Sequence, residues 1–189
     1  MMNLTHLFKR MTLGLVLAAV PLAGGCGDNT LTWQEEVKLL DGRVITVTQK
    51  RRYDADKMPR EAWLIFKLPE FSNNEIVWHE NLEIQVLNVY QGKLYVVGFT
   101  YGMLENRQYG ADYVPYRYDA GQWMRIPLAD IPVAIYDTNM YPGHMLLDRR
   151  KQVSVADKIE IFKDDRWDAS QRRIVPNFKS IASQNNERR

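Results

Sequence analysis

Cys26 is the residue of this 189-residue chain whose chemistry is the most constrained. It is the only cysteine, and it follows the small residues Ala23, Gly24 and Gly25. One cysteine cannot form a disulfide within its own chain, so the thiol requires another use. Its place directly after small residues, where a signal peptidase would cut, suggests that this use is linked to export.

The N-terminal segment has the three parts of an export signal. Lys9 and Arg10 supply a positive region, residues 11–20 form a run without charges, and small residues follow at 23–25. The run is too short to cross a bilayer, because a transmembrane helix needs about 20 apolar residues and Pro21 would break this one. We therefore expect residues 1–25 to be a cleaved signal peptide. The alternative is an ordinary signal peptide that happens to lie beside a cysteine.

The sequence LAGGC at residues 22–26 resembles the lipobox of bacterial lipoproteins. In that family the cysteine becomes the new N-terminus and carries acyl chains such as palmitate. The match departs from the usual pattern in one respect, because alanine occupies position 23, where leucine is commonest. The resemblance implies that Cys26 is the lipidation site, that the protein meets the membrane through this acylated residue, and that residues 26–30 are a lipidated tether.

The residues after the cysteine bear on which membrane holds the anchor. Gly27 follows Cys26, and by resemblance to enterobacterial sorting rules this favours the outer membrane, with the domain in the periplasm. Asp28 keeps the inner membrane possible. The resemblance therefore implies a lipid-anchored protein of the bacterial cell envelope.

Other side chains are poorly spaced for catalysis or metal binding. His79 and Glu80 are adjacent, and neighbours on a strand point to opposite faces, so they cannot act together without a bulge. His144 follows a turn and is expected to be exposed. Two separated histidines without a second cysteine make a poor metal site. We expect no catalytic residue, no metal and no cofactor.

Four carboxylates lie near aromatic residues, which is the composition that sugar hydrolysis uses. Two of them fall at an expected turn and an expected loop, where aspartate commonly serves the backbone. A cell-wall hydrolase that uses carboxylates is therefore kept as an alternative to a binding protein. The four candidates are Asp112, Asp119, Asp130 and Asp137.

Aromatic residues are concentrated in one third of the domain, from residue 90 to residue 123. In β proteins such residues usually stack across strands and fill the core. The functional alternative is that Tyr101, Tyr109 and Tyr113 form an exposed surface in a glycine-containing loop. Tyrosine rings there could contact a glycan or another protein of the envelope.

The charge excludes one class of partner. Without residues 1–25, which contain Lys9 and Arg10, the chain has 23 basic and 23 acidic residues. The mature domain is formally neutral, so its charge gives no reason to expect nucleic-acid binding. Residues 149–189 hold 11 basic and 6 acidic residues, which predicts a basic segment that is solvated or lies against an acidic body.

The 164 residues after the leader predict one β-rich domain. Residues 31–53 alternate as a hairpin around a loop at residues 41–43, with Leu39 opposite Ile45 and Val37 opposite Val47. Residues 62–68 are almost continuously apolar, which predicts a strand covered on both faces. Residues 76–78 predict a further short strand.

Two more hairpins are predicted, one around residues 91–92 and one around residues 119–121. The first places Val89 opposite Leu94, Leu87 opposite Val96 and Ile84 opposite Phe99. Residues 131–136 predict another strand, bounded by prolines.

The C-terminal part is ambiguous in the sequence. Ser154 and Asp157 have the spacing of a capping box and predict a helix, whereas residues 159–162 also alternate as a strand. The expected fold is an all-β or β-rich antiparallel meander or sandwich of roughly seven to nine strands, with a short helical or irregular C-terminal segment. We expect one domain over residues 31–180 and a frayed tail at 181–189.

The runs WQEEVKL at residues 33–39, DGRVI at 41–45 and IPVAIYDTNM at 131–140 resemble those of uncharacterised bacterial proteins of unassigned function. This resemblance implies no chemistry. The favoured function is a non-enzymatic binding or interaction domain anchored in the envelope. The alternatives are a cell-wall hydrolase and a structural or exclusion lipoprotein that blocks another molecule.

Overall fold

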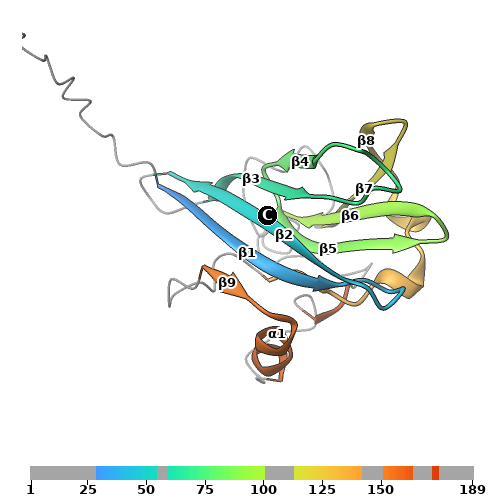
Figure 1. Cartoon of the computed structure of the whole chain (residues 1–189). Coiled ribbons are helices and arrows are strands. Elements are labelled where there is room, and N and C mark those ends of the chain that lie inside the picture. Colours follow the sequence, from blue (N-terminus) through green and yellow to red (C-terminus); the bar gives the residue numbers. More distant parts are fainter. Residues whose placement is uncertain (1–28, 55–58, 101–112, 142–150, 164–171, 175–189) are drawn as a thin grey trace, which may run out of the picture.

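The computed structural model describes residues 29–54, 59–100, 113–141, 151–163 and 172–174, which form two β-sheets and one short C-terminal helix (Figure 1). The first sheet has the strand order β4-β3-β2-β1-β9, and the second has the order β5-β6-β7-β8. Neighbouring strands are antiparallel, except that β1 and β9 are parallel over two residue pairs. The expected β-rich fold of seven to nine strands with a short helical C-terminal segment is confirmed.

The strands of the first sheet are β1 (Thr30–Lys38), β2 (Val44–Tyr53), β3 (Pro59–Phe66), β4 (Ile76–Glu80) and β9 (Gln152–Val153). Those of the second sheet are β5 (Glu83–Tyr90), β6 (Lys93–Phe99), β7 (Tyr113–Asp119) and β8 (Gln122–Arg125). Two 3-10 helices, η2 (Leu128–Asp130) and η3 (Val133–Ile135), follow β8, and the α-helix α1 (Val155–Phe162) follows β9. No helix in the described ranges has the length and apolarity needed to cross a bilayer.

The hairpin of β1 and β2 has the faces that the sequence predicts but a different register. Val37 pairs with Ile45, and Glu35 pairs with Val47. The predicted pairs, Leu39 with Ile45 and Val37 with Val47, are wrong by two residues. A shift of two residues keeps every side chain on its own face, so the division into a buried and an exposed face is still right.

The loop of this hairpin explains the error in register. Leu39 donates its N–H to the carbonyl of Arg43 at 2.8 Å, so the loop consists of residues 40–42. Gly42 has a φ of +89°, which glycine adopts at the last position of a three-residue hairpin loop. The expected loop at residues 41–43 placed this glycine in the middle.

The second sheet is a four-stranded meander, and its turns were predicted correctly. Gln91 and Gly92 have positive φ values of 49° and 70°, and Ala120 and Gly121 have values of 47° and 84°. Two successive residues with positive φ form the tight turn that matches the twist of a hairpin. The two predicted hairpins at residues 91–92 and 119–121 are therefore confirmed.

The registers within this sheet agree with the prediction up to a bulge. Val89 faces Leu94, and Leu87 faces Val96, as expected. A register shift between Ile84 and Val86 then moves Ile84 opposite Gly98 instead of Phe99. The third predicted pair is wrong because a β-bulge adds one residue to β5 that the alternating pattern does not reveal.

The main core lies between the two sheets. It contains side chains of β1 to β4 from one sheet and of β5 to β7 from the other, including Leu64, Trp78, Leu87 and Val96, each at most 1% exposed. Trp78 meets Tyr116 edge to face across the sandwich, with ring centroids 5.6 Å apart. Burial of this apolar surface from both sheets stabilises the sandwich, since each fully buried large side chain contributes roughly 1.5–3 kcal/mol.

β3 differs from the prediction of a strand covered on both faces. Ala62, Leu64 and Phe66 are buried, but Trp63 and Ile65 on the other face are only partly buried. The outer face of the first sheet is not covered by another layer of described residues. The continuous apolar run is explained by Trp63, which packs against His79 of β4 with ring centroids 4.5 Å apart.

Residues 131–136, predicted as a strand, instead contain η3, and η2 precedes it. Pro127 and Pro132 are the N-caps of these 3-10 helices, so the prolines begin helical turns and do not bound a strand. Ile131 and Ile135 cover the outer face of the second sheet, where they join a second apolar cluster. The prediction was wrong because apolar residues spaced by four also suit a helical segment.

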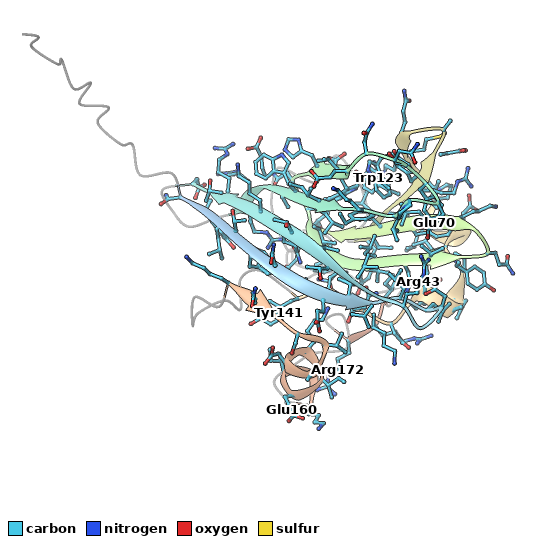
Figure 2. All side chains as sticks on the ribbon, in the orientation of Figure 1. Arg43, Glu70, Trp123, Tyr141, Glu160 and Arg172 are labelled. Atoms are coloured by element: carbon cyan, nitrogen blue, oxygen red, sulfur yellow. The ribbon has the colours of Figure 1, made fainter. Side chains whose placement is uncertain are left out.

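α1 resolves the ambiguity at the C-terminus in favour of a helix. Ser154 is its N-cap, and its hydroxyl accepts the N–H of Asp157 at 3.1 Å while the Asp157 carboxylate accepts the Ser154 N–H at 2.8 Å. This capping box satisfies two backbone donors at the helix start. In Figures 1 and 2, α1 lies below β1, and Tyr141 lies between them.

Two side chains join the sheets at their margins. On one side, Trp123 of β8 donates its indole N–H to the carbonyl of Val77 at 2.8 Å, which links β8 to the edge strand β4 (Figure 2). On the other side, Asn139 links β1 to β5. These contacts protect strand edges that would otherwise present unpaired backbone groups.

Gly98 of β6 packs so closely against Leu82 that we expect Gly98→Ala to destabilise the fold. A Cβ at position 98 would lie 2.7 Å from Leu82 Cβ and 2.8 Å from Leu82 Cδ1. Overpacking of this kind costs about 1–3 kcal/mol. Urea unfolding should show a lower midpoint with an unchanged slope, and an unchanged midpoint would show that Leu82 moves aside freely.

Candidate functional site

The residues predicted for lipidation and binding are mostly outside the described ranges. Cys26, Tyr101 and Tyr109 lie there, as do His144 and Asp112. The structure therefore describes one of the three predicted binding tyrosines.

That tyrosine, Tyr113, is not exposed. It begins β7, is 2% exposed, and packs against Phe99 with ring centroids 5.0 Å apart. Both rings belong to the apolar cluster on the outer face of the second sheet. The alternative that aromatic residues of this region fill the core therefore applies to Tyr113, which is not available for contact with a glycan or a protein.

The described histidine and carboxylates do not converge. His79 lies on the exposed face of the first sheet, stacked on Trp63, with its Nε2 3.7 Å from a carboxylate oxygen of Glu61. Asp119 and Asp130 are exposed on separate segments, and Asp137 is ion-paired with Arg173. Among the described residues, no group of three or more His, Cys, Asp or Glu side chains could hold a metal ion.

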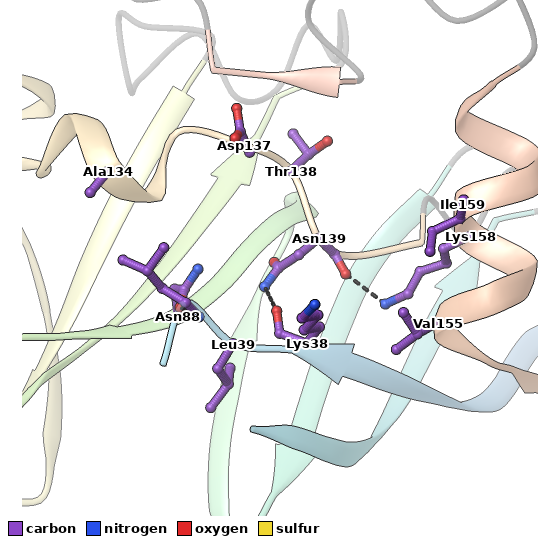
Figure 3. A pocket seen from close by; sticks show the side chains of 11 residues that line it. Lys38, Leu39, Asn88, Ala134, Asp137, Thr138, Asn139, Val155, Lys158 and Ile159 are labelled. Atoms are coloured by element: carbon purple, nitrogen blue, oxygen red, sulfur yellow. Dashed lines mark hydrogen bonds between the residues drawn. The ribbon is translucent and has the colours of Figure 1, made fainter. Parts of the chain in front are cut away.

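A pocket of about 360 Å³ lies where the loop of the β1–β2 hairpin, β5, the segment around η3 and α1 meet (Figure 3). We call it the β1–α1 pocket. Its volume falls in the range of ordinary ligand sites. Its lining residues are Lys38, Leu39, Leu40, Asn88, Ala134, Asp137, Thr138, Asn139, Val155, Lys158 and Ile159.

Asn139 is the centre of this pocket. Its amide nitrogen donates to the carbonyl of Lys38 at 3.1 Å and to that of Leu87 at 2.7 Å, and its amide oxygen accepts the N–H of Leu87 at 3.0 Å. The Asn139 side chain therefore pairs with both the N–H and the carbonyl of Leu87, as a neighbouring strand would, and it also binds a backbone carbonyl of β1. The backbone carbonyl of Asn139 accepts Lys158 Nζ at 2.6 Å, which adds α1 to the same cluster (Figure 3).

Behind Asn139 lies a buried ion pair. Lys158 Nζ is 3.2 Å from Glu35 Oε1, and the two side chains are 5% and 0% exposed. Glu35 also accepts the indole N–H of Trp33 at 3.1 Å, the amide of Gln49 at 2.8 Å and the backbone N–H of Tyr141 at 3.1 Å. A buried carboxylate needs this many donors because the water that would otherwise solvate it is excluded.

Burial lowers the pKa of Lys158 from its ordinary value, and the nearby Glu35 carboxylate opposes this shift. Desolvation is the larger effect because the ammonium group is enclosed between β1, Asn139 and α1. The Lys158 ammonium donates hydrogen bonds to Glu35 and to the carbonyl of Asn139. It therefore stabilises the wall of the pocket and does not point into it as a reactive group.

Two polar groups remain available in the β1–α1 pocket. Asn88 is 5% exposed, and its amide oxygen accepts the N–H of Leu40 at 2.7 Å and that of Val89 at 3.0 Å. Its amide nitrogen has no partner among the described residues, and Figure 3 shows Asn88 across Asn139 from Lys158. Lys38 is exposed at the rim and forms no ion pair within the described part of the chain.

The arrangement is suited to binding. Asn88 and Lys38 can donate hydrogen bonds to a carbonyl or carboxylate, and Leu39, Leu40 and Ile159 provide aliphatic surface. A few polar groups among apolar walls are typical of ligand sites. The remaining charged groups of the lining, Asp137 and Lys158, are already paired.

Sequence reasoning missed this pocket. Asp137 was considered only as a candidate for sugar hydrolysis, and Asn88, Asn139 and Lys158 were not considered at all. One signal was present, since the capping-box spacing of Ser154 and Asp157 predicted the helix that carries Val155, Lys158 and Ile159. Nothing in the sequence pairs that helix with Asn139 or Glu35.

The fold and the pocket define a β-sandwich domain with an open, mostly aliphatic surface site. No family model, no curated protein and no solved structure matches the chain.

We expect Asn139→Ala to destabilise the protein by about 2–4 kcal/mol, because it leaves the backbone N–H and carbonyl of the buried Leu87 in β5 without partners and removes the bond to the Lys38 carbonyl of β1. The free energy of unfolding in urea measures the effect. Asn74→Ala is the matched control, since Asn74 is exposed and only its backbone N–H is bonded, to Ser72. A loss for Asn139→Ala no larger than that of the control would contradict the bridging role.

Lys158→Met should change the pH dependence of stability. Because the pKa of Lys158 is lowered in the folded state from 10.5, the unfolded chain binds more protons than the folded one between these two values. The stability of the unsubstituted protein should therefore rise relative to that of Lys158→Met as the pH approaches 10.5. Urea unfolding of both proteins from neutral to alkaline pH tests this, and a difference that falls with pH would refute the assigned cause.

Proposed function

We propose that this protein is a lipid-anchored lipoprotein of the bacterial envelope whose folded domain binds a partner without catalysing a reaction. The anchor is Cys26, acylated after removal of residues 1–25. The outer membrane is the favoured site, with the domain in the periplasm, and the inner membrane is the alternative. Supporting this, β1 begins at Thr30, four residues after Cys26, so the folded body starts directly after the tether.

The β1–α1 pocket is the observation that carries the binding function. It combines aliphatic walls with an amide donor on Asn88 and a cation on Lys38, neither of which has a partner among the residues that the structure describes. Exposed apolar side chains surround it, since Leu40 is 48% exposed and Ile159 is 52% exposed. Exposed apolar groups gathered around a concave site are typical of interaction surfaces.

The alternative of a cell-wall hydrolase gains no support from the described residues. Two of its candidate carboxylates are exposed at the ends of different elements, since Asp119 ends β7 and Asp130 ends η2. Asp137 lines the pocket but is paired with Arg173. A glycoside hydrolase needs two carboxyl groups roughly 5–9.5 Å apart across the scissile bond.

Cys26→Ser tests the anchor. The unsubstituted protein should incorporate labelled palmitate and fractionate with membranes, whereas Cys26→Ser should incorporate none and be released in soluble form or retained unprocessed. Mass spectrometry of the mature N-terminus is the second measurement. An unacylated Cys26, or a mature N-terminus at another residue, would overturn the proposal of a lipid anchor.

A further inference from the structure

We propose that the β1–α1 pocket binds a segment of a partner protein that carries an aliphatic or aromatic side chain next to an acidic residue. The apolar side chain enters between the hairpin loop and α1, and the carboxylate lies beside Lys38. This inference rests on the proposed binding function and specifies the chemistry of the partner.

The walls of the pocket favour an apolar side chain. Leu39, Leu40, Ala134, Val155 and Ile159 supply aliphatic surface from three separate parts of the chain. Leu40 and Ile159 are about half exposed, at 48% and 52%, so a side chain seated between them would remove surface on both from water. Full burial of one leucine-sized side chain contributes roughly 1.5–3 kcal/mol to binding, and polar contacts must supply the rest.

The polar groups of the pocket favour an acceptor beside that side chain. The amide nitrogen of Asn88 is a donor on a residue that is only 5% exposed, and it has no partner among the described residues. The Lys38 ammonium is likewise unpaired within them. Asn88 suits a main-chain carbonyl of a bound segment, and Lys38 suits a carboxylate.

The internal charges do not offset this preference for an anion. Asp137 is paired with Arg173, Glu35 with Lys158, and Glu160 with Lys163. The Glu36 carboxylate accepts the N–H of Val155 at 3.1 Å and is not part of the pocket lining. Among the charged lining residues, Lys38 is therefore the one without an ion-pair partner in the described part of the chain.

A glycan fits this pocket less well than a peptide. A sugar presents hydroxyl groups in many directions, and aliphatic walls would leave several of them without hydrogen-bond partners. The described lining residues include no aromatic ring on which a sugar could lie. A peptide presents the required combination, an apolar side chain next to polar main-chain groups.

The location of the pocket argues against a lipid chain as the occupant. β1 begins at Thr30, beside the tether, and reaches the pocket at Lys38. Eight steps of about 3.3 Å give a separation of roughly 26 Å along the strand. In Figure 1, the two ends of β1 lie at opposite sides of the sandwich. The pocket is thus at the end of the domain farthest from the anchor.

Peptide selection on the intact protein tests the partner chemistry. The full-length lipoprotein is purified from membranes in detergent and panned with a displayed library of random twelve-residue peptides. We expect the recovered peptides to be enriched in an apolar residue within two positions of Asp or Glu. Binding should weaken at least tenfold for Leu40→Glu and for Ile159→Glu.

The control is Met124→Glu on β8, because Met124 is 49% exposed and lies outside the pocket. It should bind the peptides as the unsubstituted protein does, and equal thermal unfolding of all variants would show that the fold is intact. Lys38→Glu should weaken the acidic peptides several-fold and favour versions in which their acidic residue is replaced by lysine. This exchange identifies the charge contact.

Three results would overturn the inference: no recovered binder, recovered peptides without acidic residues, or peptides that bind Ile159→Glu unchanged. The Cys26→Ser protein is tested in parallel with the same peptides. Retained peptide binding together with an unacylated Cys26 would refute the anchor alone. Acylated Cys26 with no peptide binding would refute the partner chemistry alone.

Discussion

The carboxylate of Glu35 is the group on which the arrangement of the C-terminal part depends. It is 1% exposed, and its donors come from Trp33, Gln49, Tyr141 and Lys158. The last two lie 106 and 123 residues away in the sequence. A buried charge that lost these donors would cost several kcal/mol. Docking of Tyr141 and α1 on β1 is therefore a condition for burying Glu35, and the C-terminal helix is an integral part of the sandwich.

Asn139 extends the same dependence to the second sheet. Its side chain bonds to the backbones of β1 and β5, while its carbonyl binds the ammonium group that neutralises Glu35. One side chain thereby provides hydrogen-bond partners for backbone groups at the edges of both sheets, where a further strand would otherwise have to pair. The bridging side chain fills less space than a strand would, and the β1–α1 pocket lies at this junction. The pocket is thus a consequence of how two sheet edges are joined.

The sequence predicted the elements better than their pairing. The turns at Gln91-Gly92 and Ala120-Gly121 have local chemistry that specifies their hairpins, and both were predicted correctly. The register of β1 and β2 was wrong because alternation fixes the face of Val37 but allows shifts of two residues. Residues 131–136 were assigned to a strand because Pro132 was interpreted as a boundary, although proline also begins helical turns. The bulge near Gln85 has no sequence signal of its own.

The candidate site was far less predictable than the fold, because local sequence patterns do not reveal contacts between residues that are distant along the chain. Lys158 is one lysine on an amphipathic helix, and Asn139 is one asparagine in a loop; each becomes distinctive only through a partner far away in the sequence. Glu35 lies among charged residues, and its burial follows from the inward phase of Trp33 and Val37 on the same strand. The alternation of β1 thus places Glu35 on the buried face, but it does not reveal which distant cation neutralises the buried carboxylate.

In the proposed anchored state, β1 also limits where a partner can be met. The strand fixes about 26 Å between the tether and the pocket, and four residues of tether add at most about 14 Å. The pocket therefore reaches no more than roughly 40 Å from the acylated residue. A partner must present its acidic, apolar segment within that distance of the membrane. This restricts the partner to proteins that are themselves at the membrane or approach it closely, and it makes the end of the sandwich at Lys38 the surface on which recognition depends.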